Sequence, residues 1–194
     1  DGLAVVHNGI IENHEEMRAR LSAIGYRFTS DTDTEVVAHL IHLYWKEDGD
    51  VFAAVRKAVA ELRGAYAIAV LSERNPETLV VARKGAPLLL GLGKGENFAA
   101  SDTSALLQVT KKIVYLEEGD VAEIGLNGVR ICDSTGSEVT RPVHESTLSA
   151  DAVELGPYRH YMQKEIFEQP GAVANTLEMV IGAQSIVPQL FGVE

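Results

Sequence analysis

The sequence predicts an α+β domain with a largely antiparallel sheet, because helical and strand patterns occupy separate stretches of the chain. Apolar residues recur at helical spacing in the first third, up to Gly64. From Ala65 onward, short segments rich in apolar and β-branched residues alternate with Gly, Pro, Asn or charged turns. Helices and strands grouped in this way favour a layered α+β domain over alternating βαβ units.

The chain opens on an apolar run, Leu3 to His7, which ends at Asn8-Gly9. Asn-Gly between apolar runs is the strongest short-range signal for a hairpin turn. Met17 and Leu21 then recur at helical spacing, so we predict a helix over residues 13–24 that stops at Gly25. Residues 26–28 are predicted to form a short strand.

A capping box, Thr32-Asp33-Thr34-Glu35, predicts the start of the next helix, with Thr32 as the cap and Glu35 reaching back to it. This helix places Val37, Leu40, Ile41 and Tyr44 on one face and ends near residues 48–50. Another helix follows, with Phe52, Val55, Val59 and Leu62 facing inward, and the two adjacent helices are expected to form one layer.

The remaining elements are predicted to be mostly strands. Residues 103–108 form a short helix between two of them, and residues 129–131 with 138–139 add a hairpin at the end. The predicted strands cover residues 65–71, 78–83, 88–92, 97–100, 113–116 and 121–124.

Composition limits the classes of function. The formal net charge of −11 argues against a nucleic-acid partner or an anionic membrane surface, because phosphate binding requires clustered Lys and Arg. No apolar run approaches the ~20 residues of a membrane span, and the first residues show no signal-peptide pattern. The single cysteine, Cys132, excludes an intrachain disulfide framework and suits a reducing compartment, so we predict a cytoplasmic protein.

The chain is predicted to contain one domain and the opening of a second. Residues 142–157 lose periodicity and are rich in small and acidic residues, which suits a linker. Helical character returns beyond them. We therefore assign residues 1–149 to the first domain, 150–157 to a linker, and 158–194 to the beginning of a second domain.

Several polar groups are better explained by structure than by chemistry. Residues 91–95 (GLGKG) fit no phosphate-binding spacing and are predicted to form a hairpin turn. His39 and His42, with Glu35 one turn earlier, have no further ligands to complete a metal site and are interpreted as the polar face of a helix. Cys132 has no neighbouring base or cation and is interpreted as an unreactive thiol.

Two features remain open from the residues alone. His7-Asn8-Gly9 is either a hairpin turn or an oxyanion hole, in which a glycine N–H and the Asn8 carboxamide stabilise a developing negative charge. Asp33 either stabilises the helix start through the macrodipole or holds the α-ammonium group of an amino acid.

The sequence resembles the glutaminase domain of the glutamine–fructose-6-phosphate aminotransferase family. Residues 158–170 (YRHYMQKEIFEQP) resemble the start of that family's sugar-isomerase half and are the most specific part of the match. The other matching runs are VVHNGIIENH (5–14), SDTDTEV (30–36), LRGAY (62–66), GENFAASD (95–102) and LEEGD (116–120).

This resemblance implies an N-terminal-nucleophile hydrolase fold, a four-layer αββα sandwich in which two antiparallel sheets lie between helical layers. In the family an N-terminal cysteine attacks the glutamine amide. The resemblance assigns the oxyanion hole to Asn8 and Gly9 and the substrate α-ammonium site to Asp33. It further implies glutamine or glutamate and fructose-6-phosphate as ligands, a homodimer, and no cofactor or metal.

The chain departs from the family at its first residue, which is Asp1 and not cysteine. Relative to the family, the sandwich is expected to lack its first strands and its nucleophile. We therefore expect that a protein made of residues 1–194 hydrolyses no glutamine, and ammonia production above the blank would contradict this. Two alternatives remain: a different amidotransferase with the same domain, and a catalytically inactive module that binds an amino acid or a protein.

Overall fold

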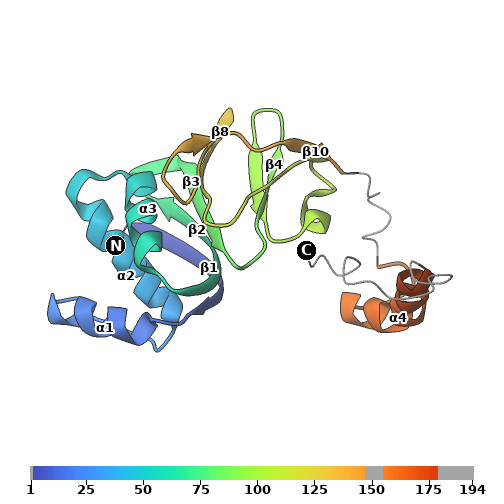
Figure 1. Ribbon diagram of the computed structural model, residues 1–194, viewed down its shortest axis with the longest axis horizontal. Coiled ribbons are helices and arrows are strands. Elements are labelled where there is room, and N and C mark those ends of the chain that lie inside the picture. The colour runs from blue at the N-terminus through green and yellow to red at the C-terminus, as the bar shows by residue number, and fades with distance from the viewer. Residues whose placement is uncertain (1, 147–154, 179–194) are drawn as a thin grey trace. The chain divides into compact units, whose positions relative to one another are not determined.

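The computed structural model describes residues 2–146 and 155–178, which belong to two compact units, 1–150 and 151–194 (Figure 1). In the first unit, three helices lie on one side of a sheet, and a smaller sheet packs on the other side.

Both sheets of the first unit are antiparallel throughout their named strands. The larger sheet has six strands in the order β1-β2-β3-β7-β8-β9, and the smaller has four in the order β10-β6-β4-β5. The strands of the larger sheet are β1 (Leu3–Ile11), β2 (Gly64–Ser72), β3 (Asn75–Lys84), β7 (Val121–Gly125), β8 (Gly128–Cys132) and β9 (Glu138–Val139). Those of the smaller sheet are β10 (Val143–Glu145), β6 (Lys112–Tyr115), β4 (Leu89–Leu92) and β5 (Asn97–Ala100).

The helical layer consists of α1 (His14–Ala23), α2 (Asp33–Asp48) and α3 (Val51–Glu61). Its main core is formed by the predicted inward faces: Val37, Leu40 and Ile41 on α2 and Val55 on α3 are fully buried against the larger sheet. Helices α2 and α3 each begin with a side-chain cap. Thr32 accepts from Thr34 N at the start of α2, and Asp50 accepts from Ala53 N at the start of α3. The predicted helix layer is confirmed.

A second core fills the space between the two sheets. Ala67 and Val81 of the larger sheet meet Leu90 and Val114 of the smaller one in this core, and all four are buried. A 3₁₀-helix, η1 (Thr103–Leu106), covers the outer face of the smaller sheet with its buried Leu106. Within the described residues of this unit, η1 is the helical element on that face of the smaller sheet.

Three local predictions were wrong. Residues 26–28 form no strand, because the Tyr26 and Phe28 rings pack against the His39 ring and the segment pairs with no described neighbour. Glu35 does not reach back to Thr32; its carboxylate accepts from the backbone and hydroxyl groups of residues 29 and 30, which lowers its pKa to about 2. Within the linker-like stretch 142–157, residues 143–145 form β10 on the smaller sheet.

The second unit contains α4 (Tyr161–Glu178), which agrees with the helical character predicted beyond residue 157. Tyr158 stacks on Phe167 with ring centroids 5.6 Å apart, so the segment before the helix folds onto it. Of the predicted linker, residues 150–154 lie outside the described residues. None of the helices in residues 2–146 and 155–178 combines the length and apolar character that a bilayer crossing requires.

The Tyr26–His42 contact leads to a prediction about pH. The Tyr26 hydroxyl lies 2.8 Å from His42 Nδ1, and burial, reinforced by nearby cations such as Lys46, lowers the pKa of the His42 imidazole below its ordinary value. Below about pH 6.5 the unfolded chain therefore protonates His42 before the folded chain does, so the free energy of unfolding falls as the pH drops. Urea titrations should show this fall weakened in His42→Gln but retained in the control His144→Gln, and equal slopes in both variants would contradict it.

Candidate functional site

Asn8 and Gly9 lie inside a continuous strand and not in a hairpin turn. The β1 register with β2 runs unbroken for nine residues, with Asn8 opposite Ala67 and Gly9 opposite Tyr66. The hairpin reading of Asn8-Gly9 is therefore wrong. Gly9 adopts a φ of +123° within the strand, a conformation that glycine permits.

Gly9 allows β1 and β2 to approach unusually closely. A Cβ on Gly9 would lie 2.1 Å from the carbonyl oxygen of Ala65, and a Cβ on Gly64 would lie 2.2 Å from the carbonyl oxygen of Ile10. Both glycines have φ near +120°, so only glycine fits at either position. Because this φ lies outside the β region, the peptide group that joins Asn8 to Gly9 departs from the regular pleat.

Asp33 ties the start of α2 to the same strand. It is the first residue of the helix, and its Oδ2 accepts a hydrogen bond from Ile11 N at 2.9 Å. The helix macrodipole favours a carboxylate at this position. The Asp33 side chain remains 22% exposed, so part of the carboxylate is open to a ligand.

His7 is a residue of this site to which sequence reasoning gave no role of its own. Its side chain is only 2% exposed, and its Nδ1 lies 3.1 Å from Thr34 Oγ1 and 3.6 Å from Asp33 Oδ1. Its Nε2 is buried without a hydrogen-bond partner among the described residues. The alternation of buried and exposed residues along β1 could have identified His7 as a buried residue. It places His7 on the helix-covered face with Leu3 and Val5.

The Asn8 side chain lies on the opposite face of β1. Consecutive strand residues point to opposite faces, so Asn8 shares its face with Val6 and Ile10, which are 69% and 67% exposed. The structure thus brings Asp33 to the strand that carries Asn8 and Gly9, but from the other face. Within the described residues β1 has one neighbour, β2, and its other edge is open.

The remaining sequence candidates have structural roles in the described part of the chain. The turn predicted over residues 91–95 is found between β4 and β5 at residues 93–96, while residues 91 and 92 belong to β4. Cys132 is buried at the end of β8. The His39 and His42 rings pack against Tyr26, and no group of three or more His, Cys, Asp or Glu side chains among the described residues is arranged to hold a metal ion.

Comparisons with known proteins point in the same direction as the resemblance. A family profile described as "Glutamine amidotransferase domain" matches residues 1–108. Glutamine–fructose-6-phosphate aminotransferases (isomerizing) from Xanthomonas campestris pv. campestris and Acidithiobacillus ferridurans are 54% and 57% identical, each over 98% of this chain and 31% of the relative. The Idiomarina loihiensis enzyme of the same name is 56% identical over 99% of this chain and 32% of its own length.

The fold agrees with solved amidotransferase structures. Glutamine phosphoribosylpyrophosphate amidotransferase from B. subtilis, complexed with ADP and GMP, superposes with a TM-score of 0.59 at 28% identity, over 71% of this chain and 30% of that one. A structure titled as the allosteric regulatory enzyme of purine biosynthesis gives 0.56 at 29% identity, over 68% and 28%. These similarities confirm the predicted fold class.

The chain spans about a third of the length of the curated relatives that it matches. The profile match covers more than half of the chain, and it includes Asn8, Gly9 and Asp33. The chain therefore belongs to the glutamine amidotransferase domain family.

Proposed function

We propose that this chain binds glutamine beside β1 and the start of α2, as part of an enzyme that transfers the glutamine amide nitrogen to fructose-6-phosphate. The relatives that carry this name are 54–57% identical over nearly the whole chain, whereas the phosphoribosylpyrophosphate amidotransferase is 28% identical over 71% of it. This difference favours fructose-6-phosphate as the acceptor over the alternative of a different amidotransferase.

The observation that carries the proposal is the position of the Asp33 carboxylate. One of its oxygens accepts from Ile11 N, and the side chain is 22% exposed beside β1. A fixed, partly desolvated carboxylate is a strong acceptor for an ammonium group. We assign it to the α-ammonium of glutamine.

The amide end of glutamine would lie near Asn8 and Gly9. Asn8 and Gly9 lie three and two positions before Ile11, whose N–H donates to Asp33, so the assigned groups share one stretch of β1. We assign the exposed Asn8 carboxamide and the Gly9 N–H to the oxyanion of the tetrahedral intermediate. We assign no nucleophile within residues 1–194, whose one cysteine is buried.

The second unit is assigned to the acceptor half of the enzyme. We propose that residues 1–149 are the glutaminase domain, 150–157 the linker, and 158–194 the beginning of the sugar-isomerase domain. The support for this assignment is the coverage of 98–99% of the chain by the aminotransferase relatives, which includes α4. We further propose that the complete protein acts in the cytoplasm as a homodimer.

Calorimetric titration of residues 1–194 with glutamate tests the ammonium site. Glutamate is the product of glutamine hydrolysis, and it keeps the α-ammonium and α-carboxylate groups of the substrate. We expect Asp33→Asn to weaken binding by about 10- to 100-fold, because a charge-assisted hydrogen bond contributes about 1.5–3 kcal/mol. Asn keeps a side-chain oxygen for Ile11 N, so this variant removes the charge with little change in the local fold.

Asp31→Ala is the matched control, since Asp31 is an exposed carboxylate two residues away. It should bind glutamate like the parent chain. If Asp33→Asn binds as tightly as the parent while both melt alike, Asp33 does not hold the ammonium. If the folded parent takes up no glutamate at millimolar concentration, residues 1–194 do not form the site.

A further inference from the structure

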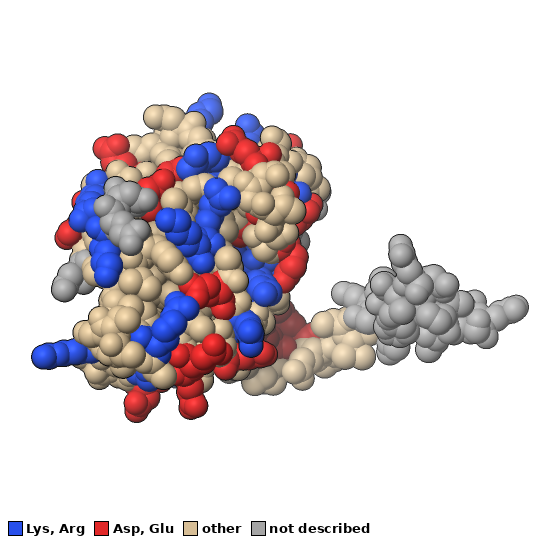
Figure 2. All heavy atoms as spheres, turned by 60° about the vertical axis from the view of Figure 1, so that its left-hand side comes forward, with Lys and Arg blue, Asp and Glu red and all other residues tan. Residues whose placement is uncertain are grey.

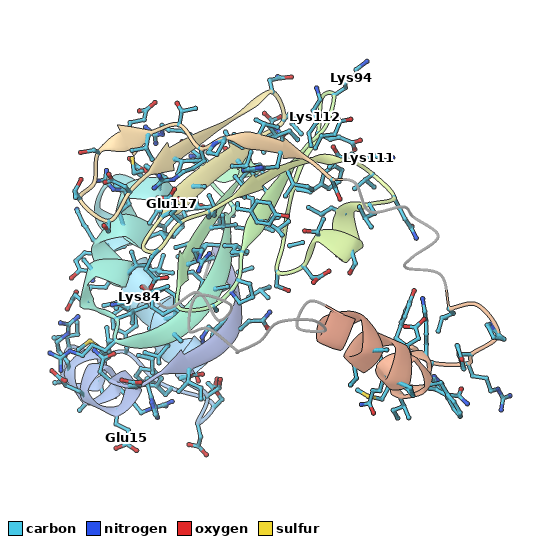
Figure 3. All side chains as sticks on the ribbon, turned by 45° about the vertical axis from the view of Figure 1, so that its right-hand side comes forward. Glu15, Lys84, Lys94, Lys111, Lys112 and Glu117 are labelled. Carbon is cyan, nitrogen blue, oxygen red and sulfur yellow. The ribbon has the colours of Figure 1, made fainter. Side chains whose placement is uncertain are left out.

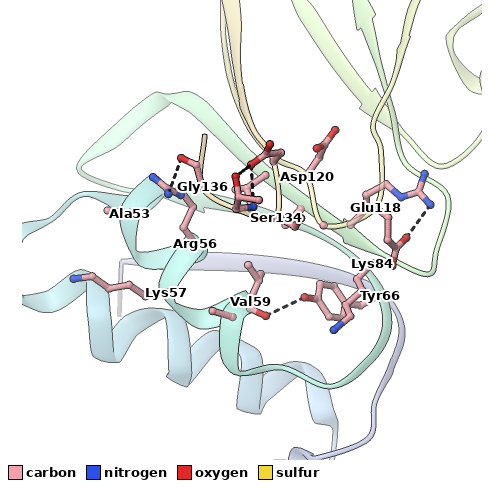
Figure 4. Close-up of a pocket in the computed structure, with 17 residues that line it drawn as sticks. Ala53, Arg56, Lys57, Val59, Tyr66, Lys84, Glu118, Asp120, Ser134 and Gly136 are labelled. Carbon is pink, nitrogen blue, oxygen red and sulfur yellow. Dashed lines mark hydrogen bonds and ion pairs between the residues drawn. The ribbon is translucent and has the colours of Figure 1, made fainter. Parts of the chain in front are cut away.

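A pocket of about 640 Å³ lies on the first unit, apart from the residues assigned to glutamine (Figure 4). It is bounded by α3, by the start of β2 and the end of β3, and by the turns before β7 and between β8 and β9. Its volume falls within the usual range for small-molecule sites. Asn8, Gly9 and Asp33 do not line it.

Arginine and lysine side chains line this pocket. Arg56 reaches from α3 to the carbonyl oxygen of Gly136 with a single 3.1 Å hydrogen bond, and Figure 4 shows Lys84 lying beside Tyr66. Arg83 is already engaged, because its Nη1 donates to the carbonyl oxygen of Leu116 at 2.8 Å and its Nη2 lies 3.5 Å from Glu118 Oε2. Lys57 points the other way, over the Tyr44 ring.

The acidic side chains of the pocket are already engaged. Asp120 is fully buried and paired with Arg141 through two hydrogen bonds of 2.7 and 2.9 Å. Glu118 accepts from Gly85 N with both carboxylate oxygens and lies 3.5 Å from Arg83. Asp133 accepts from the backbone and hydroxyl groups of its own turn, which lowers its pKa. Because Arg83 is paired with Glu118, the pocket-facing cations that form no ion pair among the described residues are Arg56 and Lys84.

Neutral groups complete the lining. The Tyr66 hydroxyl donates to the carbonyl oxygen of Val59 at 3.3 Å, and burial raises the pKa of this phenol to about 12, so it stays neutral. Ser134 adds a hydroxyl from the β8–β9 turn. The apolar part of the wall is formed by Ala53, Val59, Ala60, Ala82 and Val121.

We propose that this pocket binds a small phosphate-bearing metabolite, held by Arg56 and Lys84. Phosphate oxygens are acceptors only, and they match the forked donors of guanidinium groups and the point charge of an ammonium group. The apolar wall suits the organic part of such a molecule. Figure 2 shows Lys and Arg side chains of this unit interspersed with Asp and Glu.

Two glycines in the turns, Gly136 and Gly119, shape the pocket wall. Gly136 has φ +86°, and a Cβ there would lie 2.3 Å from Arg56 Nη2. Gly119 has φ +80°, and a Cβ there would lie 2.7 Å from Ser134 Cβ. Both turns can therefore approach closely, which keeps the Arg56 guanidinium at the pocket wall.

Pyrophosphate titrated into residues 1–194 at low ionic strength, followed by backbone amide NMR shifts, tests the proposal. We expect saturable shifts at Gly119 and Gly136, and an approximately tenfold weaker Kd in Lys84→Gln, as expected for loss of one charge-assisted contact. No contact of the described fold involves the Lys84 ammonium group, so this variant should fold normally. Lys94→Gln and Lys112→Gln are matched controls at exposed lysines elsewhere on the unit (Figure 3).

Shifts that do not saturate, or that weaken equally in Lys84→Gln and in the controls, would overturn the proposal, because they would reflect general attraction to surface charge. Absence of shifts at Gly119 and Gly136 would overturn it as well. Asp33→Asn should leave pyrophosphate binding unchanged, so failure of the glutamine assignment and failure of this one give different results.

Discussion

Asp120→Ala is expected to lower the free energy of unfolding by about 3–5 kcal/mol, the usual cost of removing one partner from a buried ion pair. The Asp120 side chain is 0% exposed and accepts from Arg141 Nε and Nη2, and its Oδ2 also accepts from Glu117 N at 2.7 Å. Its removal leaves the largely buried Arg141 guanidinium without its main counter-ion. The pair therefore joins the turn before β7 to the segment that precedes β10.

Urea denaturation measures this effect, and neighbouring groups provide the controls. Glu117→Gln alters a carboxylate that is 64% exposed and also contacts Arg141, so it should change stability by less than about 1 kcal/mol. Arg141→Ala should cost about as much as Asp120→Ala, and the double variant should cost clearly less than the two together. Additive losses would show that the two side chains do not act as a pair.

Element type was predictable from the sequence wherever apolar periodicity was strong. The inward faces of α2 and α3 followed from spacing, since Leu40 and Val55 recur with their neighbours at helical intervals and are buried as expected. The strands from β2 to β9 were bounded by turn residues and were found within a few positions. A short element such as β10 escaped, because three exposed residues produce no periodic signal and depend on pairing with β6.

The candidate site was predictable only in part, because its geometry depends on contacts between distant segments. The Thr32 cap was visible as a local pattern, whereas the bond from Ile11 N to Asp33 joins residues 22 positions apart. The hairpin alternative for Asn8-Gly9 was wrong for the same reason. Its local signal is real, but pairing with β2 overrides it, and no local pattern reports that Ala65 will lie against Gly9.

Gly9→Ala is expected to destabilise the domain by about 2–5 kcal/mol. A left-handed φ costs a non-glycine residue about 1–2 kcal/mol, and overpacking adds about 1–3 kcal/mol. Both costs apply here, since φ is +123° and the new methyl group would lie 2.1 Å from a backbone oxygen that cannot rotate away. Gly64→Ala should have a similar effect, because a methyl group on β2 would lie 2.2 Å from the carbonyl oxygen of Ile10 on β1.

Two other glycines separate the two costs. Gly95 has φ +73° with open space around its Cβ position, so Gly95→Ala should lose only the conformational part, about 1–2 kcal/mol. Gly128 has neither a left-handed φ nor a near neighbour, and Gly128→Ala should stay within about 0.5 kcal/mol of the parent. If Gly9→Ala were no worse than Gly95→Ala, the close approach of β1 and β2 would be wrong, and with it the displaced peptide group on which the proposed oxyanion hole depends.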